Sequence, residues 1–230
     1  EELGDAGGDT GTGRYGPWPA SGEIDVAESR GNPATYWPGG YPQGRNVVGS
    51  TLHYGNLQGN GLLVDGWPNA HGVRVKTEDS FADEFLTYGL YWDKNRMYTY
   101  VLDQKDENKE HVILDITAEK IRNGFWNPPL GGSGVDGRWQ ENPYQGQATN
   151  APFDQPFYLI LNVAVGGTWY FGGETPWSHC YTQGCDLKTA FWEGRGQWLP
   201  SWEEAGDKLA MQVDWIKVWQ LDEMKLKQKT

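Results

Sequence analysis

The stretch that decides the fold reads Gly16-Pro17-Trp18-Pro19-Ala20-Ser21-Gly22-Glu23-Ile24-Asp25-Val26-Ala27-Glu28. Its second half resembles a β-strand and carries three acids, Glu23, Asp25 and Glu28. Side chains alternate between the two faces of a regular strand, so Glu23 and Asp25 share one face and Glu28 points to the other. A β-bulge, one extra residue at 26–27, would return Glu28 to the face of the other two.

Three carboxylates on one face repel one another unless they share protons or perform chemistry. The arrangement therefore indicates a site whose acids have separated pKa values, as the paired carboxyl groups of a glycosidase require. The alternative interpretation is a solvated strand face with scattered acids, since charged edge strands are common.

Composition favours one all-β domain. A chain of 230 residues with 14% aromatic residues, 32 glycines and 13 prolines is typical of short strands joined by turns. A net charge of -12 argues against nucleic acid or an anionic membrane as partner. The sequence contains no apolar run of about 18 residues, so it predicts no membrane span. The 13 tryptophans and a mean hydropathy of -0.70 indicate half-exposed rings that can stack on sugars, and we expect a secreted protein with a neutral partner.

The alternation of apolar residues predicts strands at 47–54, 86–92, 96–103, 111–116 and 209–221. The nearly continuous apolar run at 157–165 predicts a strand buried on both faces in the middle of a sheet, with Asn162 in need of a partner. Two stretches rich in Gly, Pro and aromatic residues, 123–155 and 167–206, are predicted as long loops, the first on the substrate side. We expect a flexible lead-in at 1–15, a catalytic domain at 16–221 and a charged tail at 222–230.

The only two cysteines, Cys180 and Cys185, are separated by a short turn-forming sequence. This spacing favours a local disulfide, with two free thiols as the alternative. Together with His179 they fall short of the four ligands of a closed zinc site.

The acidic string Glu23-Ile24-Asp25-Val26-Ala27-Glu28 resembles the Glu-x-Asp-x-x-Glu signature of glycoside hydrolase family 16, and residues 15–21 resemble its laminarinase (endo-β-1,3-glucanase) branch. Four further segments match the family in the family's order, at 51–55, 87–92, 157–167 and 213–219. The resemblance implies a β-jelly-roll sandwich whose concave sheet forms a substrate cleft. It also implies retaining hydrolysis of β-1,3-glucosidic bonds, with Glu23 as nucleophile, Glu28 as acid/base and Asp25 as supporting acid.

Other residues gain expected roles from the same resemblance. Trp18 is expected to be a stacking platform for a sugar, with an ordinary core tryptophan as the alternative, and Trp169 a second platform. His53 and Asn162 are expected to make polar contacts in the cleft, although His53 also fits a purely structural histidine. Asp214 resembles the position of a structural calcium ligand, and no cofactor is expected for catalysis.

The chain departs from the family pattern at its start, because the family has several strands before the acidic motif. We therefore expect a jelly roll that lacks its N-terminal strands, completed in one interpretation by a second polypeptide, with a β-glucan polysaccharide as the other partner. The opposing hypothesis is a non-catalytic module that recognises β-1,3-glucan. Such modules typically lack the catalytic glutamates, and this chain keeps both, so the sequence favours the enzyme.

Overall fold

The computed structural model describes residues 13–34, 43–77, 80–102, 109–132, 139–165, 184 and 186–220. The chain divides into two compact units, one that contains the described residues up to Phe157 and one that begins at Tyr158. The described strands all lie in the first unit and the longer described helices in the second. In the described part of the chain, every helix is too short or too polar to cross a bilayer.

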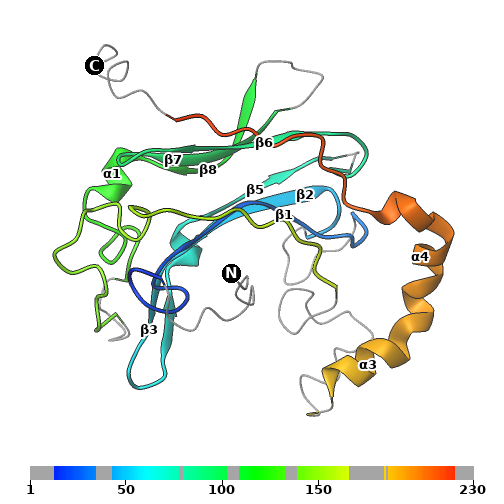
Figure 1. The fold of residues 1–230 in the computed structure, drawn as a ribbon, viewed down its shortest axis with the longest axis horizontal. Helices are drawn as coiled ribbons and strands as arrows, with labels where there is room; N and C mark the ends of the chain where they lie inside the picture. Colours follow the sequence, from blue (N-terminus) through cyan, green and yellow to red (C-terminus); the bar gives the residue numbers. More distant parts are fainter. Residues whose placement is uncertain are drawn as a thin grey trace. The chain divides into compact units, whose positions relative to one another are not determined.

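The first unit contains two three-stranded antiparallel sheets, which Figure 1 shows as two layers. One sheet has the order β1-β2-β5, formed by β1 Glu23–Ser29, β2 Val47–His53 and β5 His71–Val75. The other has the order β6-β7-β8, formed by β6 Thr87–Trp92, β7 Met97–Leu102 and β8 Glu110–Ile116. A two-stranded hairpin, β3 Gly55–Leu57 with β4 Leu63–Asp65, extends from the end of β2. The short helices are η2 Trp67–Asn69 and α1 Ala118–Ile121.

The hydrophobic core lies between these two sheets. Leu52 of β2 packs in one buried cluster with Met97 of β7 and Ile116 of β8. A second cluster joins Val48 of β2 to Val101 and Ile113. This two-layer packing confirms the all-β class and the strands predicted from alternation at 47–54, 86–92, 96–103 and 111–116, each within a residue of its observed ends. The jelly-roll topology stays a prediction.

The segment after α1 is irregular, as predicted, and its position on the substrate side stays a prediction, but part of it builds the core, which the sequence did not indicate. Phe125, Leu130 and Phe153 are almost completely buried in the core beneath β2. Tyr54 donates its hydroxyl proton to the carbonyl oxygen of Leu130 over 2.7 Å. Large aromatic rings bury much apolar area, so a segment without hydrophobic periodicity can still contribute to the hydrophobic core.

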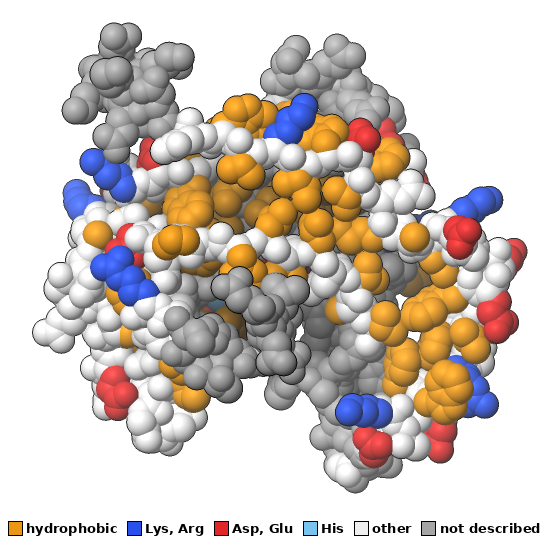
Figure 2. All heavy atoms as spheres, in the orientation of Figure 1, with side chains coloured by type: hydrophobic (Ala, Val, Ile, Leu, Met, Phe, Trp, Pro, Cys, Tyr) orange, Lys and Arg blue, Asp and Glu red, His pale blue; other side chains and the backbone are white. Residues whose placement is uncertain are grey.

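The predicted loop at 167–206 is wrong for its described end, which is helical. The elements there are α3 Leu187–Glu193, η5 Gly194–Gln197, α4 Leu199–Ala205 and η6 Gly206–Leu209. Asp186 caps α3, because its side chain accepts the backbone N–H groups of Lys188 and Thr189. Phe191 stacks on Trp198 with ring centroids 4.6 Å apart, which holds the two helices together. Hydrophobic side chains of these helices remain on the surface, where Figure 2 draws hydrophobic atoms in orange. Trp192 is 56% exposed.

The strands predicted at 157–165 and 209–221 are not formed in the described residues. Residues 158–165 and 211–220 carry no strand assignment and are exposed, with Leu161 at 53% and Trp219 at 73%. An apolar run reports only that a segment would gain from burial, whereas a strand also needs a neighbour for its backbone hydrogen bonds. Neither segment pairs with a described strand.

Candidate active site

The acidic strand contains the predicted bulge. Across β1 and β2, Glu23 lies opposite His53, Asp25 opposite Thr51 and Glu28 opposite Gly49. Two residues therefore separate Asp25 from Glu28 on β1, where a single residue, Ser50, separates their partners on β2. Ser50 also donates its hydroxyl proton to the carbonyl oxygen of Asp25 over 2.6 Å, which ties the bulge to β2. The extra residue puts all three acids on one face of the sheet.

The register also sets the spacing of the two glutamates. Their partners His53 and Gly49 are four positions apart, which corresponds to roughly 13 Å along a strand. Asp25 lies between them, so the two longer side chains can lean toward each other over the shorter one. The carboxyl groups sense each other, because the charge of Glu23 is one of the causes that raise the pKa of Glu28.

Both glutamates bind a proton more tightly than a free side chain does, but their surroundings differ. Burial, and next the charge of Asp25, raises the pKa of Glu28 to about 7, so this carboxyl group holds its proton in mildly acidic solution. Burial and the charge of Asp25 also raise the pKa of Glu23, but a hydrogen bond from Trp18 and the charge of His53 oppose that rise. The net shift of the Glu23 pKa is still upward, but Trp18 gives its carboxylate form a hydrogen bond, and no side-chain hydrogen bond is among the causes for Glu28.

Trp18 is placed beside the acids by a turn that precedes β1. Its indole Nε1–H donates to Oε2 of Glu23 over 2.6 Å, and its ring centroid lies 5.4 Å from that of His53. The ring is 41% exposed, which excludes the alternative of an ordinary core tryptophan. The turn itself is held by Gln155, whose Nε2–H donates to the carbonyl oxygen of Ser21 over 2.8 Å. Sugar stacking on Trp18 stays a prediction, and the hydrogen bond to Glu23 is a role that sequence reasoning missed.

His53 lies between two carboxylates. Its Nε2 is 3.2 Å from Oδ2 of Asp25, and its Nδ1 is 2.6 Å from Oδ2 of Asp65. Burial alone would lower the pKa of His53, but the hydrogen bonds to Asp25 and Asp65 and their charges outweigh it and raise the pKa to about 10. The ring is therefore an imidazolium at neutral pH, with both of its N–H groups donated.

Asp65 was missed in the sequence, although a signal for it exists. The sequence Gln58-Gly59-Asn60-Gly61 between two short apolar runs is typical of a hairpin turn. That hairpin forms as β3 and β4, and its register brings Asp65 opposite Gly55, close to the end of β2. On the other side of β2, Thr51 bonds His71 of β5 over 3.0 Å between Oγ1 and Nδ1, a contact that sequence reasoning also missed.

The roles of the remaining predicted residues, the cleft contact of Asn162 among them, stay predictions. Asn162 and Asp214 belong to the second unit, where both are exposed. In the described part of the chain, no cluster of three or more metal-binding side chains includes Asp214, and its calcium role stays a prediction. Trp169, Cys180 and Cys185 lie outside the described residues, so the second stacking platform and the disulfide also stay predictions.

Glu23, Asp25 and His53 are close enough to be considered as metal ligands, with one ligand atom of each within 4.8 Å of the others. A protonated imidazole has no lone pair to give to a metal, and both nitrogens of His53 are engaged by carboxylates. The cluster therefore fits a proton-sharing network better than a metal centre.

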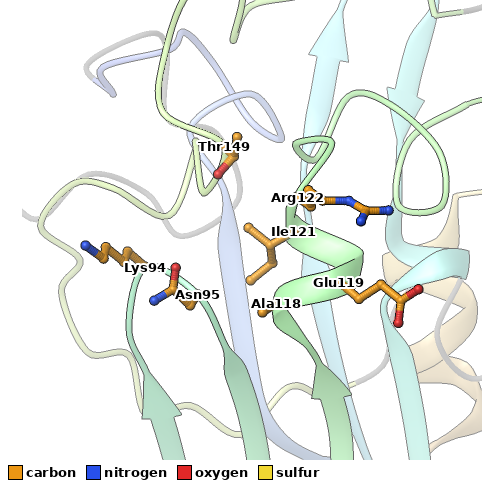
Figure 3. A pocket seen from close by; sticks show the side chains of 7 residues that line it. All are labelled: Lys94, Asn95, Ala118, Glu119, Ile121, Arg122 and Thr149. Carbon is orange, nitrogen blue, oxygen red and sulfur yellow. The ribbon is translucent and has the colours of Figure 1, made fainter. Parts of the chain in front are cut away.

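A surface pocket elsewhere in the first unit offers no comparable chemistry. Figure 3 shows it between the β6–β7 turn and α1, lined by Lys94, Asn95, Ala118, Glu119, Ile121, Arg122 and Thr149. Its single carboxylate, Glu119, points away from the Lys94 and Asn95 side chains. A single acid cannot supply the pair that glycoside hydrolysis requires.

Comparisons with known proteins find relatives whose names refer to β-1,3-glucan. No protein-family model matches the chain, and no solved structure matches it. A β-1,3-glucan-binding protein of Penaeus monodon is 38% identical over 224 residues, which cover 90% of this chain and 52% of that protein. Glucan endo-1,3-beta-glucosidase A1 of Niallia circulans is 32% identical over 70% of this chain and 17% of that protein. Glucan endo-1,3-beta-glucosidase of Cryptopygus antarcticus is 34% identical over 70% of this chain and 43% of that protein.

The chain therefore spans about half the length of the Penaeus protein and less of the two glucosidases. Its similarity extends over most of its own length to proteins of two kinds, β-1,3-glucan-binding proteins and glucan endo-1,3-β-glucosidases.

Proposed function

We propose that this chain is the catalytic part of a retaining endo-β-1,3-glucanase related to the laminarinase branch of glycoside hydrolase family 16. The observation that carries the proposal is the bulge between Asp25 and Glu28, which aligns the three acids of the motif on one face of β1. Similarity to two glucan endo-1,3-β-glucosidases supports the substrate class. The partner in this proposal is a β-1,3-glucan polysaccharide.

The proposed reaction has two steps. The carboxylate of Glu23 attacks the anomeric carbon while Glu28 gives its proton to the glycosidic oxygen, so the C–O bond breaks and a covalent glycosyl–Glu23 ester forms. Glu28, now a carboxylate, then takes a proton from water, and the resulting hydroxide attacks the same carbon and releases Glu23. Two displacements on opposite faces of the sugar retain its configuration.

The surroundings of each carboxyl group support this division of roles. A pKa of about 7 leaves Glu28 protonated for the first step, yet low enough to give up the proton. Trp18 donates to Glu23 and stabilises its carboxylate form. Asp25, held by His53, lies between them, and its charge raises the pKa of both glutamates.

A second candidate function is binding of β-1,3-glucan without hydrolysis. The 38% identity to a β-1,3-glucan-binding protein favours it. The same face of β1 with the exposed ring of Trp18 would then act as a recognition surface, and the acids would serve only as hydrogen-bond acceptors for sugar hydroxyls.

Digestion of laminarin distinguishes the two functions. The parent chain is compared with Glu23→Gln and with Asp115→Asn, which removes a carboxylate that pairs with Arg96 over 2.8 Å on the other sheet. The enzyme proposal expects reducing ends from the parent and from Asp115→Asn but none above background from Glu23→Gln. Binding to insoluble β-1,3-glucan by all three chains, without reducing ends from any, would instead support the recognition module.

A further inference from the structure

We propose that Asp65 is a positioning residue of this site, which holds His53 through Nδ1 and thereby fixes the contact that His53 makes with Asp25. The inference rests on the proposed function, because it assigns Asp65 a part in the same reaction. Asp65 would not touch the substrate, and it would act only through His53.

The geometry forms a continuous chain of hydrogen-bonding groups. Asp65 Oδ2 lies 2.6 Å from Nδ1 of His53, and Nε2 of the same ring lies 3.2 Å from Oδ2 of Asp25. The three side chains are only 11%, 22% and 16% exposed for Asp65, His53 and Asp25. Water therefore competes weakly for these contacts, and the shorter of the two is the one to Asp65.

Asp65 is itself held from several directions, so it can orient another group. Its other carboxylate oxygen, Oδ1, accepts the backbone N–H of Trp67 over 3.1 Å. The next residue, Gly66, donates its N–H to the carbonyl oxygen of Tyr54 over 2.7 Å and packs so closely on the Tyr54 ring that a Cβ would collide with it. Tyr54 is fully buried. Asp65 is therefore tied, through Gly66, to the buried residue Tyr54, which directly follows His53 in the chain.

A carboxylate at Nδ1 determines what Nε2 can do. A neutral histidine carries one ring proton and can place it on either nitrogen, whereas the imidazolium donates from both. With Asp65 in place, Nε2 carries a proton aimed at Asp25. Without Asp65, the neutral ring has only one N–H group and nothing holds Nδ1. The ring can then turn away from β1, which frees Asp25 to move.

The charge of His53 extends to several groups around it. The titratable groups that interact with His53 lie on three other strands. They are Glu23, Asp25 and Glu28 of β1, Asp65 of β4 and His71 of β5. The imidazolium lowers the pKa of both Glu23 and Glu28 against the causes that raise them. Loss of Asp65 should therefore move both limbs of the pH–rate profile to higher pH, an effect that simple loss of stability would not produce.

The test is a titration of the histidine side chains by NMR in the whole chain, parent beside Asp65→Asn. The resonance of His53 is assigned by its disappearance in His53→Gln. We expect the parent to keep both ring N–H groups well above pH 7, and the pKa of His53 to fall by at least about one pH unit in Asp65→Asn. Asp115→Asn removes a comparable paired carboxylate from the other sheet and should leave the His53 titration unchanged.

The pH dependence of laminarin hydrolysis provides the second readout. The proposal expects Asp65→Asn to lower kcat/KM at neutral pH and to move both limbs upward. It is overturned by a parent His53 that titrates near 6.5, by an unchanged His53 pKa in Asp65→Asn, or by limbs that do not move. If Asp65→Asn fails to fold, the parent titration alone decides. A parent that hydrolyses no glucan but keeps the raised His53 pKa would overturn the proposed function and leave the Asp65–His53–Asp25 contacts standing.

Discussion

Strand β2, Val47–His53, and the segment 158–165 are similar in length and were both predicted as strands, but they lie in different surroundings. Leu52 in β2 is 1% exposed, with β1 and β5 on either side of its strand, whereas Leu161 is 53% exposed. β2 pairs on both edges, so its backbone is satisfied and its register is fixed. The difference shows that an apolar pattern alone does not form a strand, because the backbone also needs neighbours that pair with it.

The largest expected effect comes from Glu28 of β1, the proposed acid/base residue. Glu28→Gln keeps the size of the side chain but cannot give up a proton, so kcat on laminarin should fall by roughly 10²–10⁴-fold. The same variant should unfold at a higher temperature than the parent at pH 8, because it removes a buried carboxylate whose pKa is raised. Reducing-end assays and thermal unfolding measure the two effects. Unchanged kcat would show that the bulged strand does not carry the reaction.

Matched leucine truncations in β2 and in residues 158–165 compare the two segments directly. Leu52→Ala removes a fully buried side chain and should lower the free energy of unfolding by about 2–5 kcal/mol. Leu161→Ala removes an exposed one and should change it by less than about 0.5 kcal/mol. Urea unfolding curves provide both values. An equal loss from the two variants would mean that residues 158–165 are packed as tightly as β2.

Matched glycine substitutions compare the packing of the backbone in the sheets of the first unit with that in the helices of the second. A Cβ at Gly72 of β5 would collide with the carbonyl oxygen of Ile113 on β8, so Gly72→Ala should destabilise the chain by about 1–3 kcal/mol. Gly196 in η5 has no atom within 4 Å of the corresponding position, so Gly196→Ala should be neutral or slightly stabilising. Thermal unfolding of the two variants measures the difference. Tolerance of alanine at Gly72 would contradict the close approach of β5 to β8.

A further expected effect is the pH dependence that Glu28 gives to the stability of the first unit. Its pKa in the folded chain is about 7, above the ordinary value of 4.5, so the folded state binds the proton more tightly than the unfolded state. The contribution to stability is therefore complete below pH 4.5 and is lost as the pH rises through about 7. In the same range kcat/KM should begin to fall, because the general acid loses its proton. Glu28→Gln should remove this part of the stability profile, and an unaltered profile would contradict the assignment.

Local patterns predicted the first unit well. The alternation around Val48 and Leu52 gave β2, and the spacing of Asp25 and Glu28 gave the bulge, because both depend on the period of two along a strand. The partner of His53 on its far side was not predicted, since Asp65 reaches it through the register of a separate hairpin.

The second unit was predicted less well, for two physical reasons. The start of α3 depends on Asp186 as an N-cap, a signal of one residue within a stretch dominated by aromatic and glycine residues. The apolar runs around Leu161 and Trp219 were predicted as strands from their need for burial alone. Pairing depends on which other segment is available, and a sequence pattern does not contain that information.

The most direct test of the proposed site is the anomeric configuration of the first products of laminarin hydrolysis, followed by proton NMR from the start of the reaction. If Glu23 and Glu28 act together across the bulge as nucleophile and acid/base, the first reducing ends must be β anomers, which then equilibrate slowly. Products that appear first as α anomers, or no products from the parent chain, would contradict a retaining site on this strand.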